Sequence, residues 1–175
     1  MLKINRCDFC CADLSFGGIM PFIALIIAAA VVALDQIIKI SVVNNIKPAG
    51  TIDVIPGVFK LSYVENRGVA FGMFQDNRWI FVVLTSLMII AIILYMFIKR
   101  PQGKLFYVLA GLIIGGGIGN LIDRILYGYV IDYLSLSFFP PVCNFADYCI
   151  TGGVIALAVY IMIKSAKGKK EIKND

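Results

Sequence analysis

The sequence predicts a membrane protein: an all-α bundle of four transmembrane helices with a small extracytoplasmic antiparallel β-sheet. Three observations lead to this prediction. Of the 175 residues, 60% are apolar and only 15% are charged. The apolar residues gather in four long uncharged runs, and one polar segment between the first two runs alternates apolar and polar residues. A soluble domain is about 45–50% apolar and about 25% charged, so a soluble globule of this size could not bury its apolar surface.

Each apolar run is close to the length that a helix needs to cross the hydrocarbon core, which is roughly 20 residues with a range of about 17–25. The runs cover residues 14–34, 79–98, 105–122 and 148–163. The last run is short, so we expect Ala146 and Asp147 to belong to its first turn. The first run should remain as a helix, because Asp35, Gln36 and Lys39 follow it where a signal peptide would have small residues for cleavage.

Basic residues indicate the orientation of the chain. Lysines and arginines gather at 99–104 and in the tail after Ile163, whereas 123–147 holds one arginine against three aspartates. Because positively charged loops stay on the cytoplasmic side, both termini should be cytoplasmic, with residues 40–78 and 124–147 outside. Much of the net charge of +5 lies in that tail, which indicates contact with membrane lipid and no nucleic-acid partner.

The chain divides into three parts. Residues 20–164 are expected to form a single four-span domain, followed by a basic cytoplasmic tail at 165–175. Residues 1–19 mix charges and cysteines without periodicity, and we interpret them as an N-terminal extension without function. Within the domain we expect a β region at about 44–77, because apolar and polar residues alternate from 51 to 65 around a Pro-Gly pair.

The residue types present limit the chemistry. The chain contains no histidine, which excludes Ser-His-Asp and Cys-His catalysis and histidine-ligated metals. Its five cysteines are an odd number, which argues against a complete disulfide framework. Cys7, Cys10 and Cys11 lack the second half of a zinc site. We therefore expect no metal and no cofactor.

Ionisable residues at the edges of the spans call for an explanation, because placing a charged side chain in a bilayer is energetically unfavourable. Asp35 and Lys39 are four residues apart, so they share a helix face and can pair. The pair either ends the helix at the interface or supports what lies beside it. The segment 66–72 (NRGVAFG) is either a polar turn before the second span or a group in which Arg67 binds a lipid headgroup or organises a carboxylate.

The third span carries small and polar residues on one face. Glycines at 111, 115 and 119 are spaced by four residues, and this spacing lets another helix approach closely. Asn120 and Asp123 continue along nearly the same face. We expect Asp123 to hold either Arg124 or Arg67.

Two further aspartates are expected at the outer end of the bundle. Asp132 lies beyond the third span and Asp147 at the start of the fourth. Two carboxyls at close range share one proton, and such a pair can activate water and polarise a carbonyl, as in aspartic proteases. Alternatively, Asp132 is a turn residue and Asp147 a helix cap. Spacing alone leaves both interpretations open.

These motifs, in this order on four spans, resemble those of the type II signal peptidases, the bacterial lipoprotein signal peptidases. The resemblance runs from about 20 to 164 and covers residues 35–39, 66–72, 119–124, 130–133 and 144–147. It implies an aspartyl endopeptidase of the bacterial inner membrane whose active site faces outward. Its implied substrates are prolipoproteins with a diacylglyceryl-modified cysteine, which the family cuts just before that cysteine. We expect a monomer.

The resemblance also implies roles for single residues. Asp132 and Asp147 would form the catalytic dyad. Asp123 would hold an arginine, and Asp35 with Lys39 would brace the first helix. The residues that would position the substrate or the dyad are Asn66, Arg67, Asn120, Arg124 and Asn144.

The competing hypothesis is a small transporter or proton relay, since intramembrane carboxylates are common in such proteins. The carboxylates of this chain, however, cluster at one end of the spans, and the middles of the spans are aliphatic. A purely structural membrane protein would leave the polar motifs unexplained. The sequence therefore favours the protease.

Overall fold

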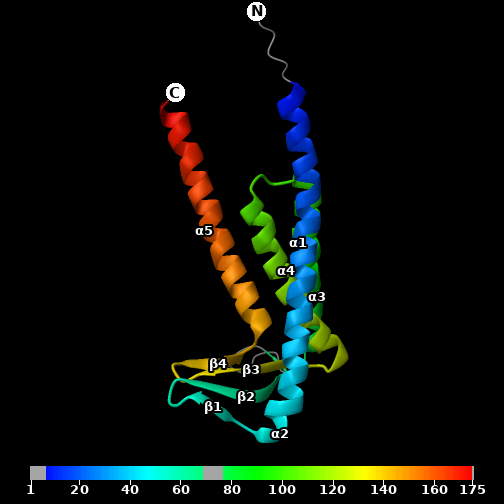
Figure 1. Cartoon of the computed structure of the whole chain (residues 1–175), viewed down its shortest axis with the longest axis vertical. Coiled ribbons are helices and arrows are strands. Elements are labelled where there is room, and N and C mark those ends of the chain that lie inside the picture. The colour runs from blue at the N-terminus through cyan, green and yellow to red at the C-terminus, as the bar shows by residue number, and fades with distance from the viewer. Residues whose placement is uncertain (1–6, 69–76, 175) are drawn as a thin grey trace, which may run out of the picture.

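The computed structural model of the chain describes residues 7–68 and 77–174, and the side chains within 18–68 and 77–166. Its helices are α1 (Cys7–Ser41), the π-helical η1 (Val42–Ile46), α2 (Lys47–Ala49), α3 (Arg78–Lys99), α4 (Lys104–Leu126) and α5 (Phe145–Asn174). Figure 1 shows the long helices standing side by side, with a sheet across one end of the bundle. The far ends of α1 and α5 both point away from that sheet (Figure 1).

Within the described residues, four helical stretches are long and apolar enough to cross a membrane. They are Gly18–Ala49, Arg78–Lys99, Lys104–Leu126 and Phe145–Ala166. The four-span bundle is therefore confirmed. The last stretch begins before the apolar run at 148–163, so Ala146 and Asp147 belong to its first turn, as the sequence predicts.

The first helical path is longer than the sequence indicates. It continues past Asp35 and Lys39 and through η1 to Ala49. Asp35 and Lys39 are 0% and 1% exposed, so their charges face the bundle and do not end the helix at an interface. Residues 44–49, expected in the β region, are helical instead, and the first strand begins at Ile52.

Glycines let α4 occupy the centre of the bundle. A Cβ on Gly111 would lie 2.7 Å from the carbonyl oxygen of Ala24, and a Cβ on Gly115 would lie 2.8 Å from that of Ala28. The backbones of α1 and α4 therefore touch at these points, as the four-residue spacing predicts. On another face of α4, a Cβ on Gly116 would collide with the start of α5.

The bundle buries a mixed core and exposes many large aliphatic side chains to its outside. Its buried core includes Ala24, Ile89, Ile114 and the aromatic Phe106 and Tyr107. Large apolar side chains that point outward on α1, α3 and α5 include Ile26, Leu87 and Ile155. Outside a bilayer this surface would be an aggregation hazard, whereas hydrocarbon chains cover it at no cost.

The sheet has four antiparallel strands in chain order. They are β1 (Ile52–Ile55), β2 (Phe59–Asn66), β3 (Val130–Leu136) and β4 (Phe139–Cys143). The hairpin of β1 and β2 is the predicted one, and Gly57 in its turn has a φ of +73°, which favours glycine. The strands β3 and β4 lie in the segment 130–143, for which the sequence predicts neither strand nor helix. The first four residues of β3 are all buried, so β3 lacks the alternation that identifies a half-exposed strand.

The pairing of β2 with β3 brings two site residues together. Val64 lies opposite Asp132, and Asn66 lies opposite Val130. On the other side, Ile131 of β3 packs with Val42 of η1. The helical extension of α1 thus supports the strand that carries Asp132.

Candidate active site

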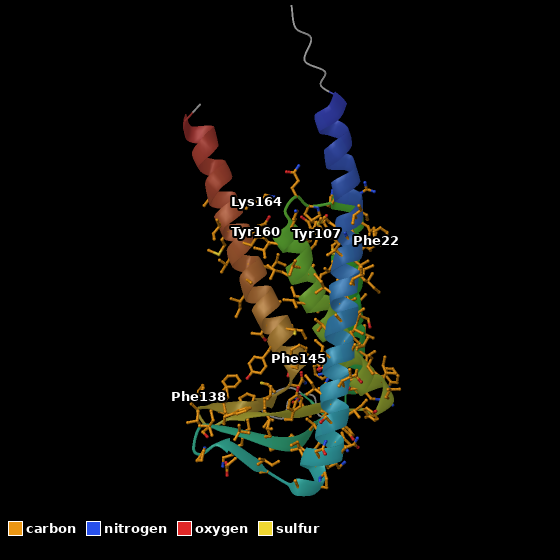
Figure 2. The ribbon with its side chains drawn as sticks, viewed as in Figure 1. Phe22, Tyr107, Phe138, Phe145, Tyr160 and Lys164 are labelled. Carbon is orange, nitrogen blue, oxygen red and sulfur yellow. The ribbon has the colours of Figure 1, made fainter. Side chains whose placement is uncertain are left out.

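Asp132 and Asp147 come from different elements and are joined by Asn144. Asp132 lies on β3, and Asp147 lies in the first turn of α5. The side-chain nitrogen Nδ2 of Asn144 donates to Asp132 Oδ1 at 2.7 Å, and its backbone nitrogen donates to Asp147 Oδ2 at 3.1 Å. One residue thus holds the two carboxyls near each other. Figure 2 shows the labelled Phe145, the next residue, where α5 meets the sheet.

Asp147 is also part of the helix cap that the sequence offers as an alternative. Its backbone nitrogen donates to Asn144 Oδ1 at 2.9 Å, so the two residues form a reciprocal capping box. The second carboxylate oxygen, Oδ1, accepts from Asn120 Nδ2 at 2.8 Å. Capping and proximity to Asp132 are therefore compatible.

Asp132 is a buried carboxyl with partners from two other elements, so it is no locally satisfied turn residue. It is 1% exposed, and its Oδ2 accepts from Asn66 Nδ2 at 2.8 Å. Burial raises the pKa of Asp132 to about 7, and the charge of Asp147 adds to the rise. The hydrogen bonds from Asn66 and Asn144 oppose it, because they stabilise the ionised form.

A buried cluster of three charges lies beside the dyad. Lys39 Nζ is 2.8 Å from Asp35 Oδ2 and 2.8 Å from Asp123 Oδ2, and all three side chains are at most 1% exposed. The predicted pair of Asp35 and Lys39 is therefore present, as a bridge between α1 and α4. The prediction that Asp123 holds an arginine is wrong. Asp123 faces α1, and its oxygens bind Lys39, Gln36 and the backbone nitrogen of Ile131.

Asn120 connects that cluster to the dyad. Lys39 Nζ donates to Asn120 Oδ1 at 3.0 Å. An ammonium group can only donate, so the amide must turn its oxygen toward Lys39 and its Nδ2 toward Asp147. Asn144 Nδ2 also donates to Asn120 Oδ1, at 3.1 Å. The lysine thus fixes which group of Asn120 faces the carboxylate.

The two arginines lie at the edge of the site. Arg124 Nη1 contacts the backbone oxygen of Asn120 at 3.4 Å, and its guanidinium lies 5.3 Å from the Phe81 ring centroid. Its charge also interacts with both aspartates of the dyad. Arg67 is bound by Glu65, at 3.1 Å, and does not hold Asp123. The rest of its motif, residues 69–72, lies outside the described residues.

Two residues to which the sequence analysis gives no role contribute to the site. Gln36 Nε2 donates to Asp123 Oδ1 at 3.1 Å and to the Gly119 oxygen at 3.3 Å. The hydroxyl of Tyr133 accepts from the backbone nitrogen of Phe145 at 3.2 Å, at the start of α5. Each is the chain neighbour of a predicted site residue, which is the only signal that the sequence offers for them.

Comparisons with known proteins agree with this architecture. Residues 27–163 match the family model described as signal peptidase II. The lipoprotein signal peptidase of Caldanaerobacter subterraneus subsp. tengcongensis is 46% identical over 140 residues, which cover 80% of this chain and 95% of that protein. The lipoprotein signal peptidase of Clostridium acetobutylicum is 37% identical over 147 residues, which cover 82% and 96%.

A solved bacterial membrane enzyme has the same fold. Its structure matches with a TM-score of 0.76 and 30% sequence identity, over 85% of this chain and 92% of that one. The family match at 27–163 contains every site residue from Asp35 to Asp147. The chain is a multi-pass bacterial membrane protein and a protease, and it belongs to the signal peptidase II family.

Proposed function

We propose that this protein removes signal peptides from diacylglyceryl-modified prolipoproteins by cutting just before the lipidated cysteine. The observation that carries the proposal is the pair of carboxyls, Asp132 and Asp147, that Asn144 holds together where the bundle meets the sheet. The similar lipoprotein signal peptidases support the substrate class. The transporter hypothesis is not favoured, because the buried charges gather at this one end of the bundle.

In the proposed reaction Asp147 is the general base and Asp132 the general acid. The oxygen of a water molecule attacks the scissile carbonyl carbon, and the water passes a proton to Asp147. Asp132 gives its proton to the carbonyl oxygen, which forms a tetrahedral diol. When the C–N bond breaks, the proton on Asp147 moves to the leaving amine, and Asp132 recovers its proton from the diol.

The surroundings of the two carboxyls support this division of roles. Asp147 lies in the first turn of α5 and accepts from Asn120 and the Asn144 backbone, so both of its oxygens are held in place to receive a proton from water. Asp132 lies on a strand, and because its pKa is raised to about 7, a substantial fraction of the molecules carry its proton at neutral pH. Each aspartate is thus suited to one of the two proton transfers.

The proposed location is the outer face of the cytoplasmic membrane, with both termini in the cytoplasm. A lipidated substrate stays in the bilayer, so it reaches a site at the interface by lateral diffusion. The diacylglyceryl chains lie against the aliphatic faces of the bundle, and the sheet covers the peptide. One copy of the chain suffices for the reaction, because Asp132, Asp147 and Asn144 come from one chain.

Cleavage by the purified full-length chain in detergent micelles tests this function. The substrate is a prolipoprotein whose cysteine carries diacylglycerol, and the products are identified by mass spectrometry. We expect two products: the free signal peptide, and the mature lipoprotein with the lipidated cysteine as its new N-terminal residue. The matched control is the same precursor without the lipid, which should stay intact. Cleavage at another bond, or equal cleavage of both precursors, would contradict the proposed substrate.

A further inference from the structure

A cavity with both polar and apolar lining residues lies at the opposite end of the bundle from the dyad. It has a volume of about 360 Å³ and opens where the connection between α3 and α4 meets α5. Its lining residues are Tyr95, Pro101, Gln102, Phe106, Tyr160, Ile161, Lys164 and Ser165. Figure 2 shows the labelled Tyr160 and Lys164 on α5, far from the sheet. The dyad uses none of these residues.

The floor of this cavity is held in place by two hydrogen bonds to one carbonyl. The hydroxyl of Tyr160 donates to the Gln102 oxygen at 3.1 Å, and Lys164 Nζ donates to the same oxygen at 3.0 Å. The adjacent Gly103 has a φ of +114°, and any Cβ there would overlap the Tyr160 hydroxyl. The connection can therefore pass this close to α5 only with glycine at that position.

Lys164 retains hydrogen-bonding capacity at the mouth of the cavity. An ammonium group has three N–H donors, and one of them binds Gln102. The walls beside it are the aromatic ring of Phe106 and the aliphatic chain of Ile161. A ligand that fits must therefore combine an anionic acceptor with an apolar portion.

The charged residues of the two segments that form the cavity are all basic. The connection contributes Lys99, Arg100 and Lys104, and α5 contributes Lys164. The segments 99–104 and 160–166 contain no acidic residue. Such a group of cations at the end of membrane-spanning helices attracts anionic lipids. The same charges repel the basic start of a signal peptide, so the substrate is not the expected occupant.

We propose that this cavity binds the phosphate headgroup of an anionic phospholipid. The phosphate accepts hydrogen bonds from the free N–H groups of Lys164, and the glycerol and upper acyl chain lie against Phe106 and Ile161. The acyl chain then continues along the outward-facing aliphatic side of α5, where Ile161 is 54% exposed and Met162 is 70% exposed.

Tryptophan quenching in vesicles tests the site without any substrate. Trp79 is the only tryptophan and lies at the sheet end of α3, so a Trp79→Phe, Ile161→Trp chain places one fluorophore in the cavity wall. The vesicles contain phosphatidylcholine with a minor share of either brominated phosphatidylglycerol or brominated phosphatidylcholine. We expect stronger quenching by the phosphatidylglycerol at equal mole fraction.

Charge variants separate this site from general attraction to a basic surface. Lys164→Gln should remove most of the preference for phosphatidylglycerol, because Gln lacks the ammonium group that donates to the phosphate, and Lys164→Arg should preserve it. Lys99→Gln removes a nearby charge that does not line the cavity and should have a much smaller effect. The proposal would be overturned if Lys99→Gln and Lys164→Gln lowered the preference for phosphatidylglycerol equally. It would also be overturned if the parent chain showed no preference for phosphatidylglycerol over phosphatidylcholine.

Free inorganic phosphate carries the same kind of anionic group as the lipid headgroup, so it is tested separately. Inorganic phosphate added at constant ionic strength should leave the quenching unchanged, because it lacks the apolar portion that the cavity walls contact. If phosphate displaces the brominated lipid, the site binds a free anion and the lipid proposal is wrong. Because the readout is lipid binding, its failure would not affect the proposed peptidase reaction, and a failed cleavage assay would not affect the lipid site.

Discussion

Among single residues, the buried Lys39 has the most consequential environment. It forms ion pairs with Asp35 and Asp123 at once and is 1% exposed. Lys39→Met keeps most of the aliphatic chain and leaves two buried carboxylates without a cation. Losing one partner of a buried ion pair costs about 3–5 kcal/mol, so the midpoint of thermal unfolding in detergent should fall strongly.

The matched control for this change lies on the sheet. Lys60 pairs with Asp53, and both side chains are about half exposed. Exposed pairs contribute about 0–1 kcal/mol, so Lys60→Met should leave the unfolding midpoint nearly unchanged. Equal effects of Lys39→Met and Lys60→Met would show that the buried cluster does not stabilise the bundle.

The pKa of Asp132 predicts how cleavage depends on pH. Asp132 must hold a proton to act as the acid, and its pKa is raised to about 7. The cleavage rate should therefore fall as the pH rises through about 7. Asn66 lowers this pKa by donating to the ionised carboxylate, so Asn66→Ala should move the decline to higher pH. A rate that is flat from neutral to strongly alkaline pH would contradict the assignment.

At this scale the sequence predicts the residues of the site better than their partners. Asp132, Asp147, Asn144 and Asn120 are connected by hydrogen bonds in the structure. The partner of Asp123 could not be predicted, because Arg124 is its chain neighbour whereas Lys39 is distant in the sequence. Only the packing of α1 on α4 brings Lys39 close.

At the scale of the elements, the contact between α1 and α4 can be tested with two glycines. A Cβ on Gly115 would lie 2.7 Å from Val31 Cβ and 2.8 Å from the Ala28 oxygen, whereas a Cβ on Gly152 meets nothing within 4 Å. Overpacking typically costs about 1–3 kcal/mol. Gly115→Leu should therefore lower the unfolding midpoint and cleavage together, while Gly152→Leu should lower neither. The reverse order would contradict the packing of the bundle.

The elements differ in how far the sequence predicts them. The four spans follow from long apolar runs, and β1 and β2 follow from alternation around Gly57. The strand β3 could not be identified, because its first four residues are all buried and therefore show no alternation of period two. The extension of α1 was equally hidden, because Asp35 and Lys39 look like the end of a span until α4 supplies their partners.

For the whole molecule, the predicted orientation has a direct test. The connection at 99–104 and the sheet lie at opposite ends of the bundle (Figure 1), so they must face opposite sides of the membrane. In a chain whose native cysteines are replaced by serine, an impermeant thiol reagent added outside whole cells should label Asn77→Cys. It should label Gln102→Cys only after the cells are broken, and the reverse pattern would place the dyad in the cytoplasm.

The central claim is that Asp132 and Asp147 perform the cleavage, and the most direct measurement is the single-turnover rate of two amide variants. Asp132→Asn and Asp147→Asn keep the shape of the side chain but cannot take up or share the proton. Each should lower the rate by about 10²–10⁴-fold or more, because acid–base catalysis typically contributes that much. The unfolding midpoint and substrate binding should be retained. Asp53→Asn, at an exposed position on β1, should cleave at the normal rate. Near-normal turnover by either dyad variant would contradict the account.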